Sequence, residues 1–504
     1  MNHDPIEKIA IIGGGTAGWM AASALSQLLG RTGIDITLIE APDIPTVGVG
    51  EATIPQINLF NQLLGIDEND FIRKTSATFK LGIEFVDWGN KGESYIHPFG
   101  TYGVDMEGIH FHHFYMKSKA LGNSNSIGDY CLQVYGAKAN KFTRPQNVPN
   151  SPLSKIAYAF QFDATLYAKY LRELSIKNGV KRIEAKVIGV SQNEDDEFIE
   201  TLTLDTGKKI DADFFIDCSG FKGLLIEDTL NAGYEDWSHW LPVNRAVAVA
   251  CEQTQDPIPY TRATAREAGW QWRIPLQHRL GNGYVYCDKY ITPEKAEKKL
   301  LDSLEGSPLA APKHLKFTTG HRKKFWDKNC LALGLSAGFM EPLESTSIHL
   351  VQSGLARLMA LFPDKGFNPS DVEYYNRRTL DEYVRVRDFL ITHYKVTRRN
   401  DTPFWNYVRT MPVPEKVNEK IEAFSSKGRT YREDMELFNE TSWLAVMEGQ
   451  GITPKGYHPM VNVLEDTEIL NRLEQIRGTV VQSEKAMPTH ADYIRAHCQS
   501  DVKA

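Results

Sequence analysis

The chain has 504 residues, 42% of them hydrophobic and 24% charged, and a formal net charge of −7. A chain of this kind can bury a large core and fits one large two-domain enzyme, whereas disorder, a membrane-spanning protein and a nucleic-acid partner are disfavoured. Six scattered cysteines without a CxxC pair, and a start without a signal-peptide pattern, predict a cytoplasmic protein with no disulfides and no metal site.

The first predicted elements form a dinucleotide-binding module. A β-branched run at residues 8–12 predicts a strand, and residues 16–30 predict a helix. Three glycines connect the two elements in GxGxxG order: Gly13, Gly15 and Gly18. Glycines here permit a tight turn and let the backbone approach a pyrophosphate at the helix N-terminus.

A second strand is predicted at residues 34–39 and ends on Glu40. This acid lies roughly 20 residues past the last glycine, where a carboxylate binds a ribose 2′-OH and disfavours a 2′-phosphate. The pattern therefore indicates NAD or FAD as the cofactor.

Later strands favour FAD. Residues 198–215 predict a hairpin around Asp205-Thr206-Gly207 that leads into a buried strand. Residues 329–338 predict another apolar strand, followed by a helix from about Ser347. Nucleotide-binding strands that recur this far apart resemble the discontinuous FAD domain of the aromatic-hydroxylase-like flavoproteins, in which a substrate domain is inserted between the pieces.

The fold class expected from this resemblance is mixed α/β (α+β), an aromatic-hydroxylase-like FAD-binding fold. We expect an FAD-binding domain in three pieces, a substrate-side domain in two pieces, and a mostly helical C-terminal region packed on both. Their bounds are 1–90, 150–235 and 320–370 for the first, 91–149 and 236–319 for the second, and 371–504 for the third. An amphipathic helix is predicted from about Pro369.

Six short motifs carry a more specific resemblance. The WxWxIP arrangement occurs as GWQWRIP at 269–275. The other five are GGGTAGW (13–19), GVGEATIP (48–55), ATFKLGI (77–83), HPFG (97–100) and EPLESTS (341–347). Together they span about two-thirds of the chain, and in this order they resemble the flavin-dependent tryptophan halogenase family.

The resemblance implies a two-component reaction on an electron-rich aromatic such as indole or a tryptophan-like compound. A separate flavin reductase using NAD(P)H would supply FAD as FADH2, and with O2 and a halide ion, chloride or bromide, hypohalous acid would form at the flavin. A lysine that matches Lys80 would deliver it to the substrate.

The residues around Lys80 are consistent with this role. Lys80 lies between Phe79 and Leu81 in a segment with few charges, and a desolvated lysine loses proton affinity. It could then act as a nucleophile that forms a haloamine, or as a hydrogen-bond donor to hypohalous acid. The alternative is a surface lysine at the start of a strand.

Glu344 matches the active-site carboxylate of the family. It would hold Lys80 in place and stabilise the positive charge that develops on the aromatic ring. A structural alternative is that residues 344–347 cap the following helix. The resemblance also implies a halide site at the backbone of Thr346 and Ser347, although many family members have glycine at the latter position.

Further residues acquire roles only through the resemblance. Trp270, Trp272 and Pro275 would line the wall between flavin and substrate, and His97 and Phe99 would sandwich an indole ring. The cofactor-binding residues implied are Gly13, Gly15, Thr16, Ala17, Gly18, Glu40, Gly50, Val187 and Leu335. His110, His112 and His113 alternate as on a strand edge and receive no role.

The chain departs from the family late in the sequence, where tryptophan-acting members carry an aromatic-rich lid over the amino acid. Residues 427–451 are short and contain few aromatics: Tyr431, Phe438 and Trp443. We therefore expect an open site that accepts free indole or a larger indole-bearing molecule.

Two alternatives remain open from the sequence. A single-component FAD-dependent aromatic monooxygenase shares the fold, but such enzymes usually have Gly-Asp where this chain has Gly334-Leu335. The other alternative is a non-catalytic flavin-binding protein. A homodimer is the default expectation for the assembly.

Overall fold

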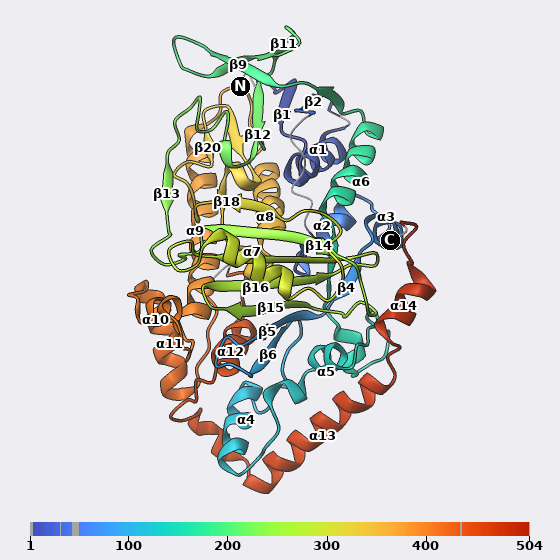
Figure 1. The fold of residues 1–504 in the computed structure, drawn as a ribbon, viewed down its shortest axis with the longest axis vertical. Helices are drawn as coiled ribbons and strands as arrows, with labels where there is room; N and C mark the ends of the chain where they lie inside the picture. Colours follow the sequence, from blue (N-terminus) through green and yellow to red (C-terminus); the bar gives the residue numbers. More distant parts are fainter. Residues whose placement is uncertain (1–3, 31, 43–49, 434–435, 503–504) are drawn as a thin grey trace.

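The computed structural model describes residues 4–30, 32–42, 50–433 and 436–502. Its upper part in Figure 1 contains a six-stranded sheet built from distant parts of the chain. The strand order is β20 (Trp326–Asp327), β21 (Cys330–Ala332), β12 (Phe214–Asp217), β1 (Lys8–Ile12), β2 (Asp35–Glu40) and β8 (Lys181–Glu184). Every neighbouring pair is parallel except β20 with β21. Parallel strands are hydrophobic on both faces and need helices to cover them.

Helix α1 (Thr16–Leu29) follows β1 directly and supplies part of this cover. Its alanines and Trp19 are buried, and it packs against α6 (Ala164–Lys177) through a 2.8 Å hydrogen bond between the hydroxyl groups of Ser23 and Ser175. The chain thus forms strand, glycine turn, helix and strand in the predicted order.

The predicted hairpin is present. Strands β9 (Val187–Gln192), β10 (Ile199–Leu204) and β11 (Lys209–Asp211) form an antiparallel sheet at the top of Figure 1. Gly207 closes the turn between β10 and β11 with a φ of +81°, a conformation that favours glycine.

A seven-stranded sheet crosses the middle of the molecule (Figure 1). Its order is β18 (Lys313–Lys316), β14 (Arg245–Cys251), β17 (Leu280–Tyr286), β16 (Gly269–Pro275), β15 (Thr261–Arg266), β5 (Gly82–Val86) and β6 (Ser94–Pro98). Trp272 on β16 lies opposite Gly283 on β17, where a Cβ would be 2.0 Å from the indole ring. Glycine at this position therefore makes room for the tryptophan.

A small sheet positions the segment that contains Lys80. Strand β7 (Ala159–Asp163) pairs with β3 (Gly50–Ala52) on one side and with β4 (Thr78–Lys80) on the other. The outer edge of β4 is reached by α14 (His490–His497), because Nε2 of His490 accepts a 3.1 Å hydrogen bond from the backbone N–H of Phe79. The C-terminal helix thereby fixes β4 in place.

Helices make up most of the C-terminal part, and the predicted helix from Pro369 is α9 (Pro369–Lys395). The other helices there are α8 (Ser347–Ala360), α10 (Pro403–Thr410), α11 (Glu415–Lys427), α12 (Glu440–Gly449) and α13 (Asp466–Lys485). Further elements are α2 (Gln56–Leu63), α3 (Glu68–Thr75), α4 (Phe111–Ala120), α5 (Leu132–Lys138), α7 (Pro293–Asp302), β13 (Tyr234–Asp236), β19 (Gly320–Arg322) and β22 (Gly338–Phe339).

The prediction of a strand edge at His110, His112 and His113 is wrong. His110 is the N-cap residue of α4, and His112 and His113 lie in its first turn, where Asp105 accepts a 2.9 Å hydrogen bond from the backbone N–H of Phe111. Three residues are too few to separate a strand period from a helical one.

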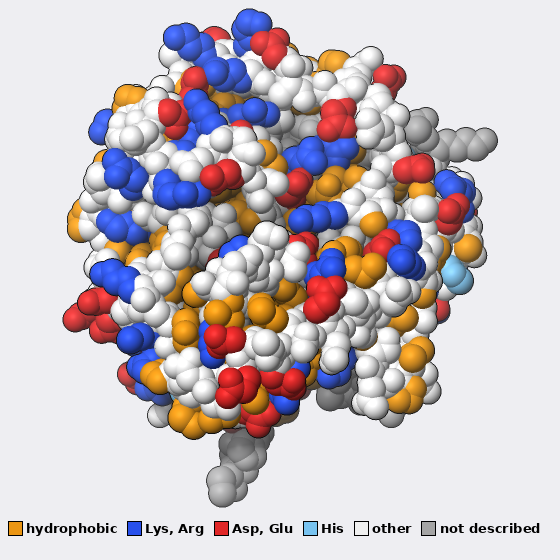
Figure 2. All heavy atoms as spheres, turned by 90° about the horizontal axis from the view of Figure 1, so that it is seen from below, with side chains coloured by type: hydrophobic (Ala, Val, Ile, Leu, Met, Phe, Trp, Pro, Cys, Tyr) orange, Lys and Arg blue, Asp and Glu red, His pale blue; other side chains and the backbone are white. Residues whose placement is uncertain are grey.

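Among the described helices, none combines the length and apolarity needed to cross a bilayer. On the face seen in Figure 2, side chains of both charges are interspersed.

Candidate active site

Lys80 is the centre of a buried polar cluster. It ends β4 with 0% exposure, and its Nζ donates to the carbonyl of Thr53 at 3.0 Å and to Oγ of Ser345 at 2.8 Å. The amine lies 5.3 Å from the centre of the Phe99 ring. Burial lowers the pKa of Lys80 to about 7, although the charge of Glu344 opposes the shift. The alternative of a surface lysine is therefore wrong.

Local structure explains why this amine points inward. In β4 the side chains alternate, and Phe79 stacks on Phe142 at 4.0 Å between ring centres, so Lys80 faces the opposite side of the strand. Ser345 ends the 3₁₀ turn Pro342–Glu344 in the left-handed conformation, with a φ of 58°. The left-handed backbone conformation costs a serine on the order of 1 kcal/mol of free energy. In this conformation the Oγ of Ser345 points at the amine of Lys80.

Glu344 is held by two histidines. Nδ1 of His97 lies 3.0 Å from both carboxylate oxygens, and Nε2 of His393 lies 2.7 Å from Oε1. Burial alone would raise the pKa of Glu344, but the charges and hydrogen bonds of His97 and His393 outweigh burial and lower it to about 2. Among the described residues, Lys80 makes no hydrogen bond to Glu344, so the two groups interact through charge.

His393 is a member of this site that the sequence did not indicate. It lies in α9 with 0% exposure, outside all six of the family motifs. A single histidine in an amphipathic helix carries no sequence signal that separates it from an ordinary core residue. The predicted sandwich of an indole by His97 and Phe99 stays a prediction, and both residues lie beside the cluster.

The two tryptophans lie on one face of β16, with ring centres 6.2 Å apart. Nε1 of Trp270 donates to Oε2 of Glu341 at 2.5 Å, and the hydroxyl of Tyr394 donates to the same oxygen at 2.6 Å. Burial raises the pKa of Glu341 to about 7. A buried carboxyl group thus orients one of the two indole rings.

Pro275, at the end of β16, connects this strand to β4. Its carbonyl accepts a 2.7 Å hydrogen bond from the hydroxyl of Thr78, two residues before Lys80. The strand that carries the tryptophans and the strand that carries the lysine are therefore fixed to each other.

The glycine turn before α1 fits a dinucleotide. Gly13 has a φ of +113°, and a Cβ on Gly18 would lie 1.8 Å from the carbonyl of Gly13. A Cβ on Gly15 would meet nothing within 4 Å, so the backbone is open at the start of the helix. Thr16 and Ala17 open the first turn, which contains no acidic residue, and its N–H groups suit a phosphate.

Other predicted cofactor residues surround the same turn. Glu40 ends β2 and accepts hydrogen bonds from Arg182 at 2.5 Å and Trp19 at 3.3 Å. Leu335 lies in the 3₁₀ turn Gly334–Ser336, where a Cβ on Gly334 would lie 2.7 Å from Ala17.

Two more of these residues begin strands. Val187 is the first residue of β9, and Gly50 is the first residue of β3. Gly48 and Val49, which belong to the GVGEATIP motif, lie outside the described residues.

The predicted halide site is at the start of α8. Thr346 is the N-cap residue, its side chain makes no capping hydrogen bond within the described chain, and Ser347 begins the helix. The prediction that side chains of residues 344–347 cap this helix is therefore wrong, and backbone N–H groups are left for another acceptor.

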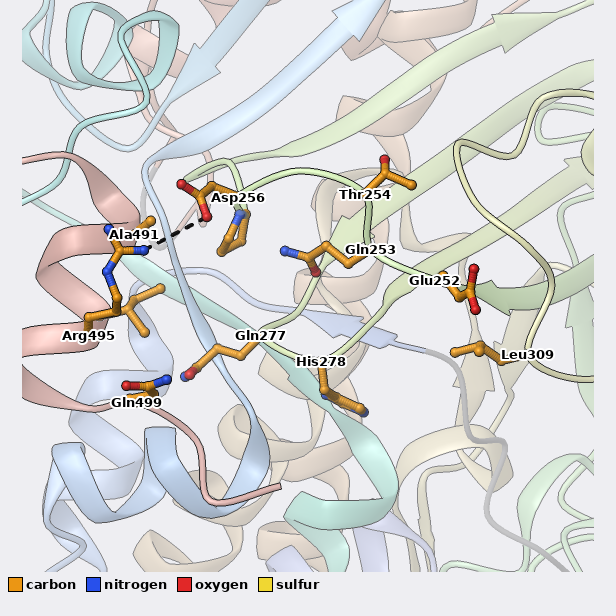
Figure 3. A pocket seen from close by; sticks show the side chains of 12 residues that line it. Glu252, Gln253, Thr254, Asp256, Gln277, His278, Leu309, Ala491, Arg495 and Gln499 are labelled. Atoms are coloured by element: carbon orange, nitrogen blue, oxygen red, sulfur yellow. Dashed lines mark ion pairs between the residues drawn. The ribbon is translucent and has the colours of Figure 1, made fainter. Parts of the chain in front are cut away.

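A cavity of about 730 Å³ lies apart from this cluster, between α14, the loop before β15 and the turn after β16 (Figure 3). Gln253, Gln277 and His278 line it, and Asp256 faces Arg495 across it at 3.9 Å. None of its lining residues belongs to the Lys80 cluster.

Comparison with known proteins identifies the family of this chain. The family model for tryptophan halogenase matches residues 8–466. Tryptophan 7-halogenase RebH of Lentzea aerocolonigenes is 32% identical, over 97% of this chain and 98% of RebH.

Solved structures agree with the sequence comparison. Xcc4156, a flavin-dependent halogenase from Xanthomonas campestris, is 44% identical with a TM-score of 0.96, covering 99% of this chain and 100% of its own. BrvH, a flavin-dependent halogenase from Brevundimonas sp. BAL3, is 43% identical with a TM-score of 0.94, and the match covers 97% of this chain and 99% of BrvH. The predicted mixed α/β fold class is confirmed. The chain belongs to the tryptophan halogenase family and is a flavin-dependent halogenase.

Proposed function

We propose that this enzyme uses FADH2, O2 and chloride or bromide to halogenate an electron-rich aromatic of the indole or tryptophan type, and that Lys80 directs the oxidised halogen. The observation that carries the proposal is the buried amine of Lys80, next to the Phe99 ring and within the field of Glu344. A separate NAD(P)H-dependent flavin reductase would supply FADH2 in the cytoplasm, and a homodimer is the expected assembly.

The residues of the chain fit the cofactor and the halide. The open glycine turn, the free first turn of α1 and Glu40 at the end of β2 suit a pyrophosphate and a ribose. The uncapped backbone at Thr346 and Ser347 suits a halide ion. When bound, FADH2 would supply two of the electrons that O2 takes up and halide the other two, so that one oxygen atom ends in water and the other in hypohalous acid.

Lys80 would act on the halogen as it arrives. In the transfer, the bond between oxygen and halogen breaks, a bond between carbon and halogen forms, and the released hydroxide takes the ring proton to give water. With a pKa of about 7, Lys80 has both protonation states available near neutral pH. The neutral amine can accept the halogen, and the ammonium form can hydrogen-bond the oxygen of the acid. Glu344 would stabilise the positive charge on the ring.

Two of the three aromatic residues of the short segment 427–451 support an open substrate site. Phe438 stacks on Phe389 with ring centres 3.9 Å apart. Trp443 is buried, and the amine of Lys420 lies 4.2 Å from the centre of the Trp443 ring. The faces of these two rings therefore contact other side chains of the protein, so they do not form a lid over a substrate. We infer that the enzyme accepts free indole or a larger indole-bearing molecule and does not require the amino-acid part of tryptophan.

A reductase-coupled assay tests the proposal. Purified enzyme with FAD, a flavin reductase and NADH is supplied with each halide and with indole, tryptophan and an indole-bearing peptide, and products are identified by mass spectrometry. We expect a halogenated product, with indole preferred over tryptophan. A hydroxylated product would instead identify a monooxygenase, and a bound flavin without product would identify a flavin-binding protein.

A pair of lysine variants tests the role of Lys80. Lys80→Met should lower halogenation at least ~1,000-fold, because it removes the group that receives the halogen. Lys117→Met changes another buried lysine, which binds Asp466 and lies outside the cluster, and should keep activity within about threefold. Equal activity of Lys80→Met and the wild type would end the proposal.

A further inference from the structure

The hydrogen bonds of His393 determine where its protons are. Nδ1 lies 2.9 Å from the carbonyl oxygen of Phe389, which can only accept, so Nδ1 carries a hydrogen. Nε2 lies 2.7 Å from Oε1 of Glu344. One of these two groups must provide the second hydrogen.

Glu344 is the acceptor in this pair. Its oxygens also face Nδ1 of His97 at 3.0 Å, and the two histidines hold the pKa of Glu344 below its ordinary value. A carboxylate has no hydrogen to donate, so Nε2 of His393 carries one as well. The hydrogen-bond pattern fits a carboxylate that accepts from both histidines.

The surroundings of His393 suit a cation. The rings of Phe85, Trp88 and Phe389 have centres 5.0, 6.1 and 4.9 Å from the His393 ring, and aromatic rings attract positive charge. His393 also lies in the last turn of α9, the negative end of the helix dipole.

We propose that His393 is a positioning residue for halogenation, which as an imidazolium holds the Glu344 carboxylate ionised and aligned in the Lys80 cluster. The proposal rests on the function proposed above. It explains why Lys80 bonds to Thr53 and Ser345: the lone pairs of Glu344 are already directed at two histidines.

Other charged and titratable groups around Glu344 come from several elements. They are Lys80 on β4, Glu51 on β3, His97 and Tyr95 on β6, and Glu341 with Tyr394 at the far side of the turn. Tyr95 has a pKa well above 10 because it is buried, so it stays neutral across the range in which the enzyme is tested. Lys80, whose pKa depends on the charge of Glu344, is therefore the other group whose titration the variants can shift.

Two substitutions separate positioning from packing. His393→Phe removes the charge and both hydrogen bonds, whereas His393→Gln keeps an N–H that can donate to Glu344. We expect His393→Phe to lower kcat at least ~100-fold with KM within about threefold, and His393→Gln to recover about tenfold of that loss. His321→Gln, at a buried histidine outside the cluster, should leave both constants within about threefold.

The pH profile of kcat gives a readout that packing alone would not move. Without the imidazolium, Glu344 takes up a proton at higher pH, so the acidic limb of kcat should move up by at least ~1 pH unit in His393→Phe. The shift should be smaller in His393→Gln. An acidic limb at the wild-type position in both variants would overturn the proposal.

The protonation state can be measured without turnover. Nitrogen NMR of flavin-free enzyme labelled at histidine should show a doubly protonated ring at pH 8 that is lost in His393→Gln and altered in Glu344→Gln. A neutral His393 at pH 8 would overturn the proposal even if the wild type halogenates. Failure of the wild type to halogenate, with the NMR result as expected, would instead overturn the proposed function and leave only the pairing of His393 with Glu344.

Discussion

Glu341 is a carboxylic acid enclosed entirely by protein, and its bonds can be tested one by one. Oε2 accepts from Trp270 and Tyr394, whereas Oε1 is buried without a partner in the described chain. Glu341→Ala leaves two buried donors unsatisfied, so we expect a loss of about 2–4 kcal/mol in the free energy of unfolding. Glu341→Gln keeps an acceptor and should lose about 1 kcal/mol. Urea denaturation followed by tryptophan fluorescence measures both.

The same residue predicts a pH dependence. Burial raises the folded pKa of Glu341 from 4.5 to about 7, so the folded state binds the proton more tightly than the unfolded state. Its contribution to stability is fully present below pH 4.5 and is lost as pH rises through 7. The stability of the wild type relative to Glu341→Gln should therefore fall between pH 5 and pH 8. A difference that stays constant over this range would contradict a neutral buried acid.

At the scale of elements, the pairing of β16 with β17 fixes Trp272 in place. A Cβ at Gly283 would lie 2.0 Å from Cζ2 of Trp272, a rigid ring that is itself 7% exposed. We expect Gly283→Ala to displace this ring and to lower the free energy of unfolding by about 1–3 kcal/mol, as overpacking does. Tryptophan fluorescence should change with it.

A glycine on another strand provides the control. At Gly189 in β9 a Cβ would lie 3.6 Å from Thr203, an ordinary contact. Gly189→Ala should therefore change stability by less than about 0.5 kcal/mol. If the two alanine variants unfold at the same urea concentration, the fit of Trp272 over Gly283 is not what makes this glycine necessary.

The elements themselves could be predicted where the signal is local. The strand, glycine turn and helix of β1 and α1 follow from a β-branched run and three glycines, and the hairpin turn at Gly207 follows from its turn residues. The histidines at the start of α4 gave no such signal, because their alternation was too short to fix a period.

At the scale of the whole molecule, the site is made by contacts that no local pattern contains. Lys80 and Ser345 are 265 positions apart in the chain, and Glu344 meets His393 from a different helix. Motifs identified Lys80 and Glu344 because each lies in a short family-specific segment. Thr53 and Ser345 lie in such segments too, but their role toward Lys80 follows only from the folded geometry.

His490 links the C-terminal helix α14 to β4 and to the loop before β15. Nε2 accepts from Phe79 and Nδ1 donates to the carbonyl of Pro257 at 2.7 Å, so the ring is neutral in the folded state. Burial lowers its pKa to about 4 from an ordinary 6.5. A depressed histidine pKa contributes stability above the unfolded value, and this stability is lost as pH falls from 6.5 toward 4.

We therefore expect acid to loosen the C-terminal helix. His490→Gln can keep both hydrogen bonds but cannot titrate, so between pH 7 and pH 5 the wild type should lose about 2 kcal/mol more of its free energy of unfolding than this variant does. Thr489→Ala removes the N-cap of α14 and should cost about 1 kcal/mol equally at both pH values. Urea denaturation at the two pH values measures all three proteins. Parallel losses in the wild type and His490→Gln would show that His490 is not the group through which acid acts.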